Sequence, residues 1–173
     1  MSVMVMQTVY LYDQIVITKT KQPGVKAETN LFYLPVDENN LACRAAKMLI
    51  DEFNITEGVH ISMDKKIPVS AGMAGGSADA AAVLFGVNKM FELGLSMTEL
   101  EERGVKLGAD VPYCLMRGTV LAEGIGEKLT PLLACPKCFC VAGKNHRSVY
   151  RRRWSMKNWM HWKLQNTRIS MVF

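Results

Sequence analysis

Residues 68–79 read PVSAGMAGGSAD, a stretch with very little side chain that leads directly into a helical pattern. From Ser70 to Ala78, every residue except Met73 is a glycine, an alanine or a serine. Such small residues let the backbone of a loop approach a neighbour closely. The neighbour is either another part of the protein, in a tight packing turn, or a ligand held by backbone N–H groups in front of a helix.

The spacing of the glycines excludes two nucleotide-binding loops. A Walker A loop ends in a lysine before its helix, and no lysine follows Gly72 in this stretch. The dinucleotide fingerprint G-x-G-x-x-G does not fit Gly72, Gly75 and Gly76. A structural glycine turn and a phosphate cradle both remain, and the length of the small-residue run favours the cradle. In a cradle, N–H groups of the helix that starts near Ser77 bind polyphosphate, and the Ser77 hydroxyl bonds a phosphate oxygen or a metal ion.

The chain before this loop predicts an alternation of strands and a helix. Residues 3–17 predict one or two strands, and residues 19–30 predict a loop or hairpin turn around Pro23-Gly24. Residues 37–53 predict a helix capped by Asn39 or Asn40. Residues 58–70 alternate again as a strand, with Val59, Ile61 and Met63 on one side.

The chain after the loop predicts two helices and a hairpin. The first helix begins near Ser77 and stops at Gly94. The second has a capping box of Thr98 with Glu101 and ends at Gly108. Residues 109–132 then predict a loop and a β-hairpin with its turn at Arg117-Gly118. The whole pattern indicates an α+β fold.

Charge divides the 173 residues into two unlike parts. All 16 acidic residues lie in residues 1–127, which are net negative, whereas residues 128–173 hold ten Lys and Arg and all three tryptophans. A basic, aromatic segment could grip phosphates and stack bases, which makes nucleic-acid binding an alternative function. Translation in a shifted reading frame would give the same composition, and both interpretations stay open.

Cysteine and hydropathy patterns point to the cytoplasm. The segment CPKCFC at 135–140 has the spacing of half a zinc site, but a second pair is missing, so reduced thiols are the simpler interpretation. No apolar run approaches the length of a transmembrane helix, and the first residues alternate like a strand rather than a signal peptide.

Asp110 is the second candidate functional residue. It lies in the segment LGADVP, after the glycine that ends a helix. A loop aspartate here could be a cap or turn residue. It could also accept a proton from a substrate hydroxyl, which would make that oxygen a nucleophile toward the γ-phosphate of a nucleotide.

The motif PVSAGMAGGSADAAA resembles the glycine-rich second signature of the GHMP kinase superfamily. The segments MVMQTVYLYDQI, DENNLACRAAKML and LGADVP, with the sequence around them, resemble one branch of it. That branch phosphorylates the 2-hydroxyl of 4-diphosphocytidyl-2-C-methyl-D-erythritol in non-mevalonate isoprenoid biosynthesis, using ATP and Mg²⁺. The resemblance spans about residues 2–142 and implies a partial GHMP kinase N-terminal domain, of the ribosomal protein S5 domain 2-like fold.

Site residues follow from this resemblance by position. Asp110 matches the catalytic aspartate, Asn40 and Lys65 match positions near the adenine, and Ser77 is the candidate Mg²⁺ ligand. The small-molecule substrate is the expected partner. The resemblance assigns the ATP phosphates to Pro68, Val69, Ser70, Ala71, Gly72, Met73, Ala74, Gly75, Gly76, Ser77 and Ala78.

The sequence departs from the family pattern in three places. Ala78 replaces a common serine of the loop, and the family's opening Lys-x-Asn strand and Gly-Tyr-His segment have no counterpart. The segment ETNLFYL at 28–34 imitates that strand, with Glu28 in place of the lysine. Residues 143–173 resemble nothing in the family and are expected to form a basic tail rather than a domain. We therefore expect impaired catalysis and low solubility, with a non-catalytic nucleotide-binding remnant as an alternative function.

Overall fold

Strands and helices alternate along the part of the chain that the structure describes. The computed structural model describes residues 3–124, 126, 128–134 and 136. The predicted tail at 143–173 and the segment CPKCFC, apart from Pro136, lie outside these residues. The elements in chain order are β1 (Met4–Gln7), β2 (Gln14–Thr20), β3 (Val25–Thr29), α1 (Leu41–Glu52), β4 (Gly58–Asp64), α2 (Gly75–Met90), α3 (Met97–Leu107), α4 (Val111–Met116), β5 (Thr119–Glu123) and β6 (Lys128–Pro131).

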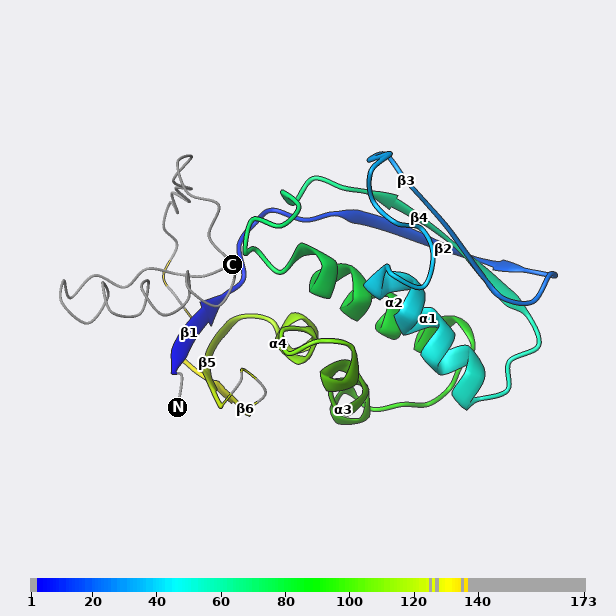
Figure 1. Ribbon diagram of the computed structural model, residues 1–173. Helices are drawn as coiled ribbons and strands as arrows, with labels where there is room; N and C mark the ends of the chain where they lie inside the picture. Colours follow the sequence, from blue (N-terminus) through cyan, green and yellow to red (C-terminus); the bar gives the residue numbers. More distant parts are fainter. Residues whose placement is uncertain (1–2, 125, 127, 135, 137–173) are drawn as a thin grey trace.

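The first sheet has β4 in its centre, between β2 and β3. β4 pairs antiparallel with β2 and parallel with β3. Val59, Ile61 and Met63 face the core from β4, as the alternation predicts. Figure 1 shows α1 and α2 under this sheet, with α3 and α4 on the far side of these helices.

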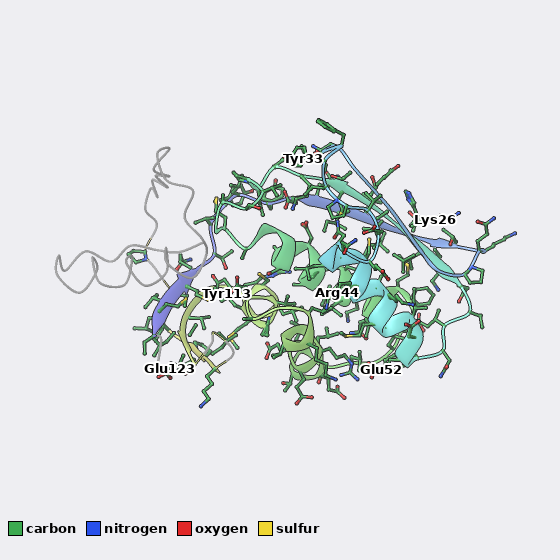
Figure 2. The ribbon with its side chains drawn as sticks, in the orientation of Figure 1. Lys26, Tyr33, Arg44, Glu52, Tyr113 and Glu123 are labelled. Carbon is green, nitrogen blue, oxygen red and sulfur yellow. The ribbon has the colours of Figure 1, made fainter. Side chains whose placement is uncertain are left out.

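The second sheet has the order β1-β5-β6 and is antiparallel throughout. Its small core contains Met6, Val120 and Ala122, together with Tyr113 from α4. The Tyr113 hydroxyl lies 3.1 Å from the Thr8 hydroxyl and donates to the Gly118 carbonyl at 3.1 Å, which fixes α4 against this sheet (Figure 2).

Two expectations about connections were wrong, and the short helix α4 was not expected. Residues 25–29 form β3 rather than loop, because Lys26 and Glu28 are the exposed positions of a strand whose other face packs on α1. The hairpin turn lies between β5 and β6, whereas Arg117 and Gly118, both with positive φ, join α4 to β5. The sequence signal of α4 is weak because the helix has only six residues and contains a proline.

The helix ends agree with the expectations in part. Asn40 is the N-cap of α1, and Gly108 is the C-cap of α3. The capping box of α3 is formed by Ser96 and Glu99, two residues before the predicted pair, because the S-x-x-E pattern also fits there. α2 extends from Gly75 to Met90, so it starts earlier and ends before the predicted stop at Gly94.

Polar contacts join the helices at their ends. Arg103 of α3 donates two hydrogen bonds to the carboxylate of Glu52 at the end of α1, whose position Figure 2 labels.

Cys43 and Cys114 are free thiols. None of the described helices combines the length and apolar character that crossing a lipid bilayer requires.

Gly58 is the glycine whose replacement is expected to disturb this fold most. A Cβ atom at Gly58 would lie 2.1 Å from the Gln22 carbonyl oxygen and 2.5 Å from that of Gly24. Backbone cannot move aside cheaply, so Gly58→Ala should lower the free energy of unfolding by about 2 kcal/mol or more in urea denaturation. Gly76→Ala is the control, because its Cβ would meet only Leu41 Cδ1 at 3.7 Å. Equal stability of the two variants would contradict the turn geometry.

Candidate functional site

The small-residue loop joins the central strand β4 to the helix α2 (Figure 1). Within it, φ is +55° at Ser70, +76° at Gly72 and +53° at Ala74. Left-handed residues in such a loop turn neighbouring N–H groups toward a common point and form an anion-binding concavity. Two of these three residues carry a side chain, and a left-handed conformation costs each about 1 kcal/mol. The loop therefore holds a strained shape that suits phosphate.

The N-terminus of α2 has no side-chain cap. Its N-cap is Ala74, and in the part of the chain that the structure describes no hydrogen bond reaches the N–H groups of Gly75, Gly76 or Ser77. The other two long helices are capped, since Asn40 accepts from the Ala42 N–H at 2.9 Å and Ser96 accepts from Glu99 at 3.3 Å. The first turn of α2 thus has free donors and the positive end of a helix dipole.

Packing explains only one of the three loop glycines. A Cβ at Gly75 would lie 3.0 Å from Ile67 Cγ2 and 3.6 Å from Lys65 Nζ, so close packing requires a glycine there. A Cβ at Gly72 would meet nothing within 4 Å, and one at Gly76 only Leu41 at 3.7 Å. A packing turn does not account for the open space around Gly72 and Gly76, which a ligand could use.

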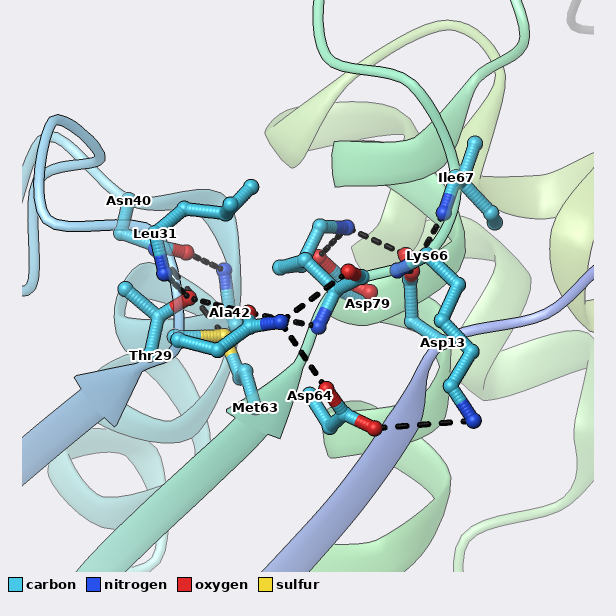
Figure 3. A network of polar contacts seen from close by, with 12 residues as sticks. Asp13, Thr29, Leu31, Asn40, Ala42, Met63, Asp64, Lys66, Ile67 and Asp79 are labelled. Carbon is cyan, nitrogen blue, oxygen red and sulfur yellow. Dashed lines mark hydrogen bonds and ion pairs between the residues drawn. The ribbon is translucent and has the colours of Figure 1, made fainter.

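Lys65 is buried between two carboxylates. Its ammonium contacts Asp13 Oδ2 and lies 2.5 Å from Asp79 Oδ2, and all three side chains are at most 6% exposed. Figure 3 shows this network at the place where β2, β4 and α2 meet. The resemblance assigned Lys65 to the adenine side; that stays a prediction, while in the structure its ammonium is directed inward.

The two carboxyl groups differ in their pKa values. Burial would raise the pKa of Asp13, but hydrogen bonds from Lys65 and from the N–H groups of Ile67 and Lys66 outweigh it and lower the pKa. Burial raises the pKa of Asp79 to about 6, although the hydrogen bond from Lys65 opposes this. The Oδ1 atom of Asp79 is buried without a hydrogen-bond partner in the described structure, so its ionised form is incompletely compensated.

Asn40 lies near this network, and its amide is used within the protein. Its Nδ2 donates to the Pro35 carbonyl at 2.8 Å, and its Oδ1 caps α1. A position beside adenine therefore also stays a prediction for this residue. Figure 3 shows that it lies beyond the end of β4, on the opposite side of the network from Asp13.

Asp110 lies at the start of α4, close to the N-terminus of α2. A Cβ at the nearby Gly108 would be 4.0 Å from the Ser77 hydroxyl, which brings the two turns together. The Asp110 side chain is partly buried and makes no hydrogen bond within the described residues. Asp79 and Asp110 both act electrostatically on Cys114, whose pKa is raised to about 12, first by burial and then by these two charges. Asp79 and Asp110 thus both lie close enough to Cys114 to act on its thiol.

A cavity of about 620 Å³ lies beside the loop, between the β1–β2 connection, α2 and α4. Its wall is mostly apolar and includes Tyr12, Met73, Ala78, Phe85, Tyr113 and Arg117. The cavity touches the small-residue loop only at Met73, Ala74 and Ala78. Sequence reasoning missed Asp13, Asp79 and Tyr113 as site residues, although an aspartate inside the quoted motif is itself a usable signal.

Metal ligands are few in this region. Among the described residues, no group of three or more His, Cys, Asp and Glu side chains could hold a metal ion. The Ser77 hydroxyl at the uncapped helix end is compatible with a cation that arrives already bound to phosphates. The assignment of Ser77 as a Mg²⁺ ligand stays a prediction.

Comparison with known proteins places this arrangement in a family. Residues 40–118 match the family model described as GHMP kinases N terminal domain. The chain is 54% identical over 146 residues to a 4-diphosphocytidyl-2-C-methyl-D-erythritol kinase of Lachnoclostridium phytofermentans, covering 84% of this chain and 50% of that protein. A protein of the same name from Lachnospira eligens is 52% identical over 141 residues, covering 82% and 49%. The chain thus spans about half the length of the curated relatives it matches.

Solved structures show the same fold. A crystal structure of 4-(cytidine 5'-diphospho)-2C-methyl-D-erythritol kinase superposes with a TM-score of 0.59 at 34% identity, covering 69% of this chain and 41% of that one. A homoserine kinase from Cytophaga hutchinsonii, at 21% identity, has a TM-score of 0.60 over 69% and 42% of the chains and supports the fold alone. On this likeness of sequence and fold, the chain belongs to the GHMP kinase family, as a partial member homologous to the 4-diphosphocytidyl-2-C-methyl-D-erythritol kinases.

Proposed function

We propose that residues Pro68–Ala78 bind the phosphates of ATP, and that the chain carries part of the machinery for phosphorylating the 2-hydroxyl of 4-diphosphocytidyl-2-C-methyl-D-erythritol. The observation that carries this proposal is the uncapped N-terminus of α2 behind a loop with three left-handed residues. Free N–H groups and a helix dipole favour a polyanion there. The relatives at 52–54% identity supply the substrate class.

Asp110 has the freedom that a general base needs. Its carboxylate makes no hydrogen bond within the described residues, and the turn at Gly108 just before it lies close to Ser77 in the first turn of α2. In the proposed reaction, Asp110 accepts the proton of the substrate hydroxyl while that oxygen forms a bond to the γ-phosphorus. The bond from that phosphorus to the bridging oxygen breaks, and ADP leaves with its electron pair.

The remaining residues of the site would position the nucleotide. Ser77 would hold a phosphate oxygen or the Mg²⁺ ion. Mg²⁺, when bound with ATP, supplies neutralisation of the charge on the transferred phosphoryl group. The alternative of a nucleotide-binding remnant shares the loop but not the transfer step, so binding and turnover are tested separately. The nucleic-acid alternative depends on residues outside the described part of the chain.

A carboxylate introduced at the end of α2 tests the binding step. Ser77→Asp places a negative charge in the first turn of a helix, where it does not destabilise the fold, but the charge repels phosphate. We expect affinity for ATP, measured by calorimetry, to fall by about tenfold or more. Thr98→Asp is the matched control, because it puts the same charge in the first turn of α3. Equal ATP affinity of both variants would exclude the loop as the phosphate site.

Removal of the charge on Asp110 tests the transfer step. Asp110→Asn should leave ATP affinity unchanged and reduce ADP formation with the diphosphocytidyl substrate by about 10²-fold or more. Asp51→Asn, on the exposed face of α1, should retain the rate. If the unaltered chain binds ATP but forms no ADP, it is a nucleotide-binding remnant. A fully active Asp110→Asn variant would remove Asp110 from the mechanism.

A further inference from the structure

The two ends of the small-residue loop are tied together by an ion pair. The chain leaves β4 at Lys65, forms the loop, and returns to the core at Asp79 in the second turn of α2. The Lys65 ammonium and Asp79 Oδ2 are 2.5 Å apart. The loop therefore starts and finishes at the two partners of one buried contact.

Asp13 fixes the same end of the loop through its second oxygen. Asp13 Oδ2 contacts the Lys65 ammonium, while its Oδ1 accepts from the N–H groups of Lys66 at 2.5 Å and Ile67 at 2.8 Å. The ladder between β2 and β4 ends at the pair of Gln14 with Asp64. Asp13 thus continues the hydrogen bonding of the sheet by a side chain, past the last backbone pair.

Asn30 does the same on the other side of β4. Its Oδ1 accepts from the Lys65 N–H at 2.9 Å, and its Nδ2 donates to the Lys65 carbonyl at 3.2 Å and to Asp64 at 2.9 Å. The residues that lead from β4 into the loop are therefore held from both neighbouring strands.

Burial separates this arrangement from an ordinary surface ion pair. The side chains of Lys65, Asp13 and Asp79 are 4%, 3% and 6% exposed. The neighbouring pair of Lys66 with Asp64 is half exposed, with 3.5 Å between the charged atoms. Surface pairs of the second kind contribute little to stability, whereas removing one member of a buried pair is strongly destabilising.

We propose that Lys65, Asp13 and Asp79 form a clasp that closes the base of the loop and holds it in the shape that binds phosphate. For its ligand the proposal rests on the proposed function, since the phosphate is that of ATP. Within it, the side chains of Lys65 and Asp13 are positioning groups that act through the loop. Ser70 and Ala74 have strained left-handed conformations, and a loop whose ends were not held would relax to a less strained conformation. The clasp prevents this relaxation.

Substitution of Asp13 provides the sharpest test, because the loss of its negative charge and the loss of the clasp should change ATP affinity in opposite directions. Removal of a negative charge near a phosphate site should strengthen ATP binding if electrostatics alone matters. Loss of the clasp should weaken it. We expect Asp13→Ala, with the far-UV circular dichroism of the folded chain, to lose about tenfold or more in ATP affinity. Hydrogen exchange at residues 69–74 without nucleotide should be faster by about tenfold.

Controls make the failure of the clasp distinct from the failure of ATP binding. Asp51→Ala removes an exposed carboxylate of α1 and should change neither measurement. If Asp13→Ala does not fold, Asp13→Asn takes its place with the same expected directions. Unchanged or tighter ATP binding by the folded variant overturns the clasp. If the unaltered chain binds no ATP, hydrogen exchange alone decides: faster exchange at 69–74 supports the clasp, and unchanged exchange overturns it.

The pH dependence of stability provides a separate prediction. The pKa of Asp79 is raised from 3.8 to about 6, so between these values the folded chain holds a proton that the unfolded chain has released. Stability contributed by this group is complete below pH 3.8 and is lost as the pH rises through about 6. The urea midpoint should fall from pH 4.5 to 7.5 more steeply in the unaltered chain than in Asp79→Asn.

The groups around Asp79 do not cancel this effect. The pKa of Asp13 is lowered, so this carboxyl changes its protonation only below pH 3.8. The Cys114 thiol, with its pKa raised to about 12, stays neutral throughout, and Asp110 is present in both proteins. The difference between the two pH profiles therefore isolates Asp79. Parallel profiles would show that the carboxyl is not buried as the clasp requires.

Discussion

The structure depends on one buried ammonium group. Lys65 is placed where the sheet ends and α2 begins, and burying a charge there costs several kcal/mol unless carboxylates surround it. Asp13 comes from the segment before β2, and Asp79 comes from α2. Satisfying this one charge therefore brings three distant segments to a single point. Hydrophobic packing between α2 and the sheet is less directional and would not by itself fix where the loop starts and ends.

This contact explains how a loop of small residues can hold an ordered shape. Glycine and alanine bring few contacts, and Ser70 and Ala74 occupy left-handed conformations that cost free energy. The stabilisation has to come from outside the loop, and the described contacts at its base supply it. The space above the loop can then stay open for a ligand. The small side chains leave space for a ligand, and the contacts at the base of the loop keep that space in a fixed shape.

Periodic features of the sequence predicted the fold well, whereas the structural roles of isolated polar residues were harder to predict. The alternation at Val59, Ile61 and Met63 and the cap at Asn40 depend on neighbours in sequence, and both are confirmed. β3 was missed because its exposed Lys26 and Glu28 make a half-buried strand look like a polar loop. The turn at Arg117 was misplaced because a six-residue helix has no visible period. Local patterns could not show which side chains meet across the fold.

The same reason explains the incomplete description of the site. The small-residue motif marked the loop, since its composition is local, but the partners of Lys65 lie 52 and 14 residues away in sequence. The resemblance placed Lys65 near the adenine, which stays a prediction, and in the structure two buried carboxylates direct its ammonium into the protein. The charge of Lys65 is thereby largely compensated by Asp13 and Asp79 inside the protein. In the proposed function, the N–H groups of the loop and of α2 therefore supply the attraction for phosphate, and their directions depend on how the base of the loop is held.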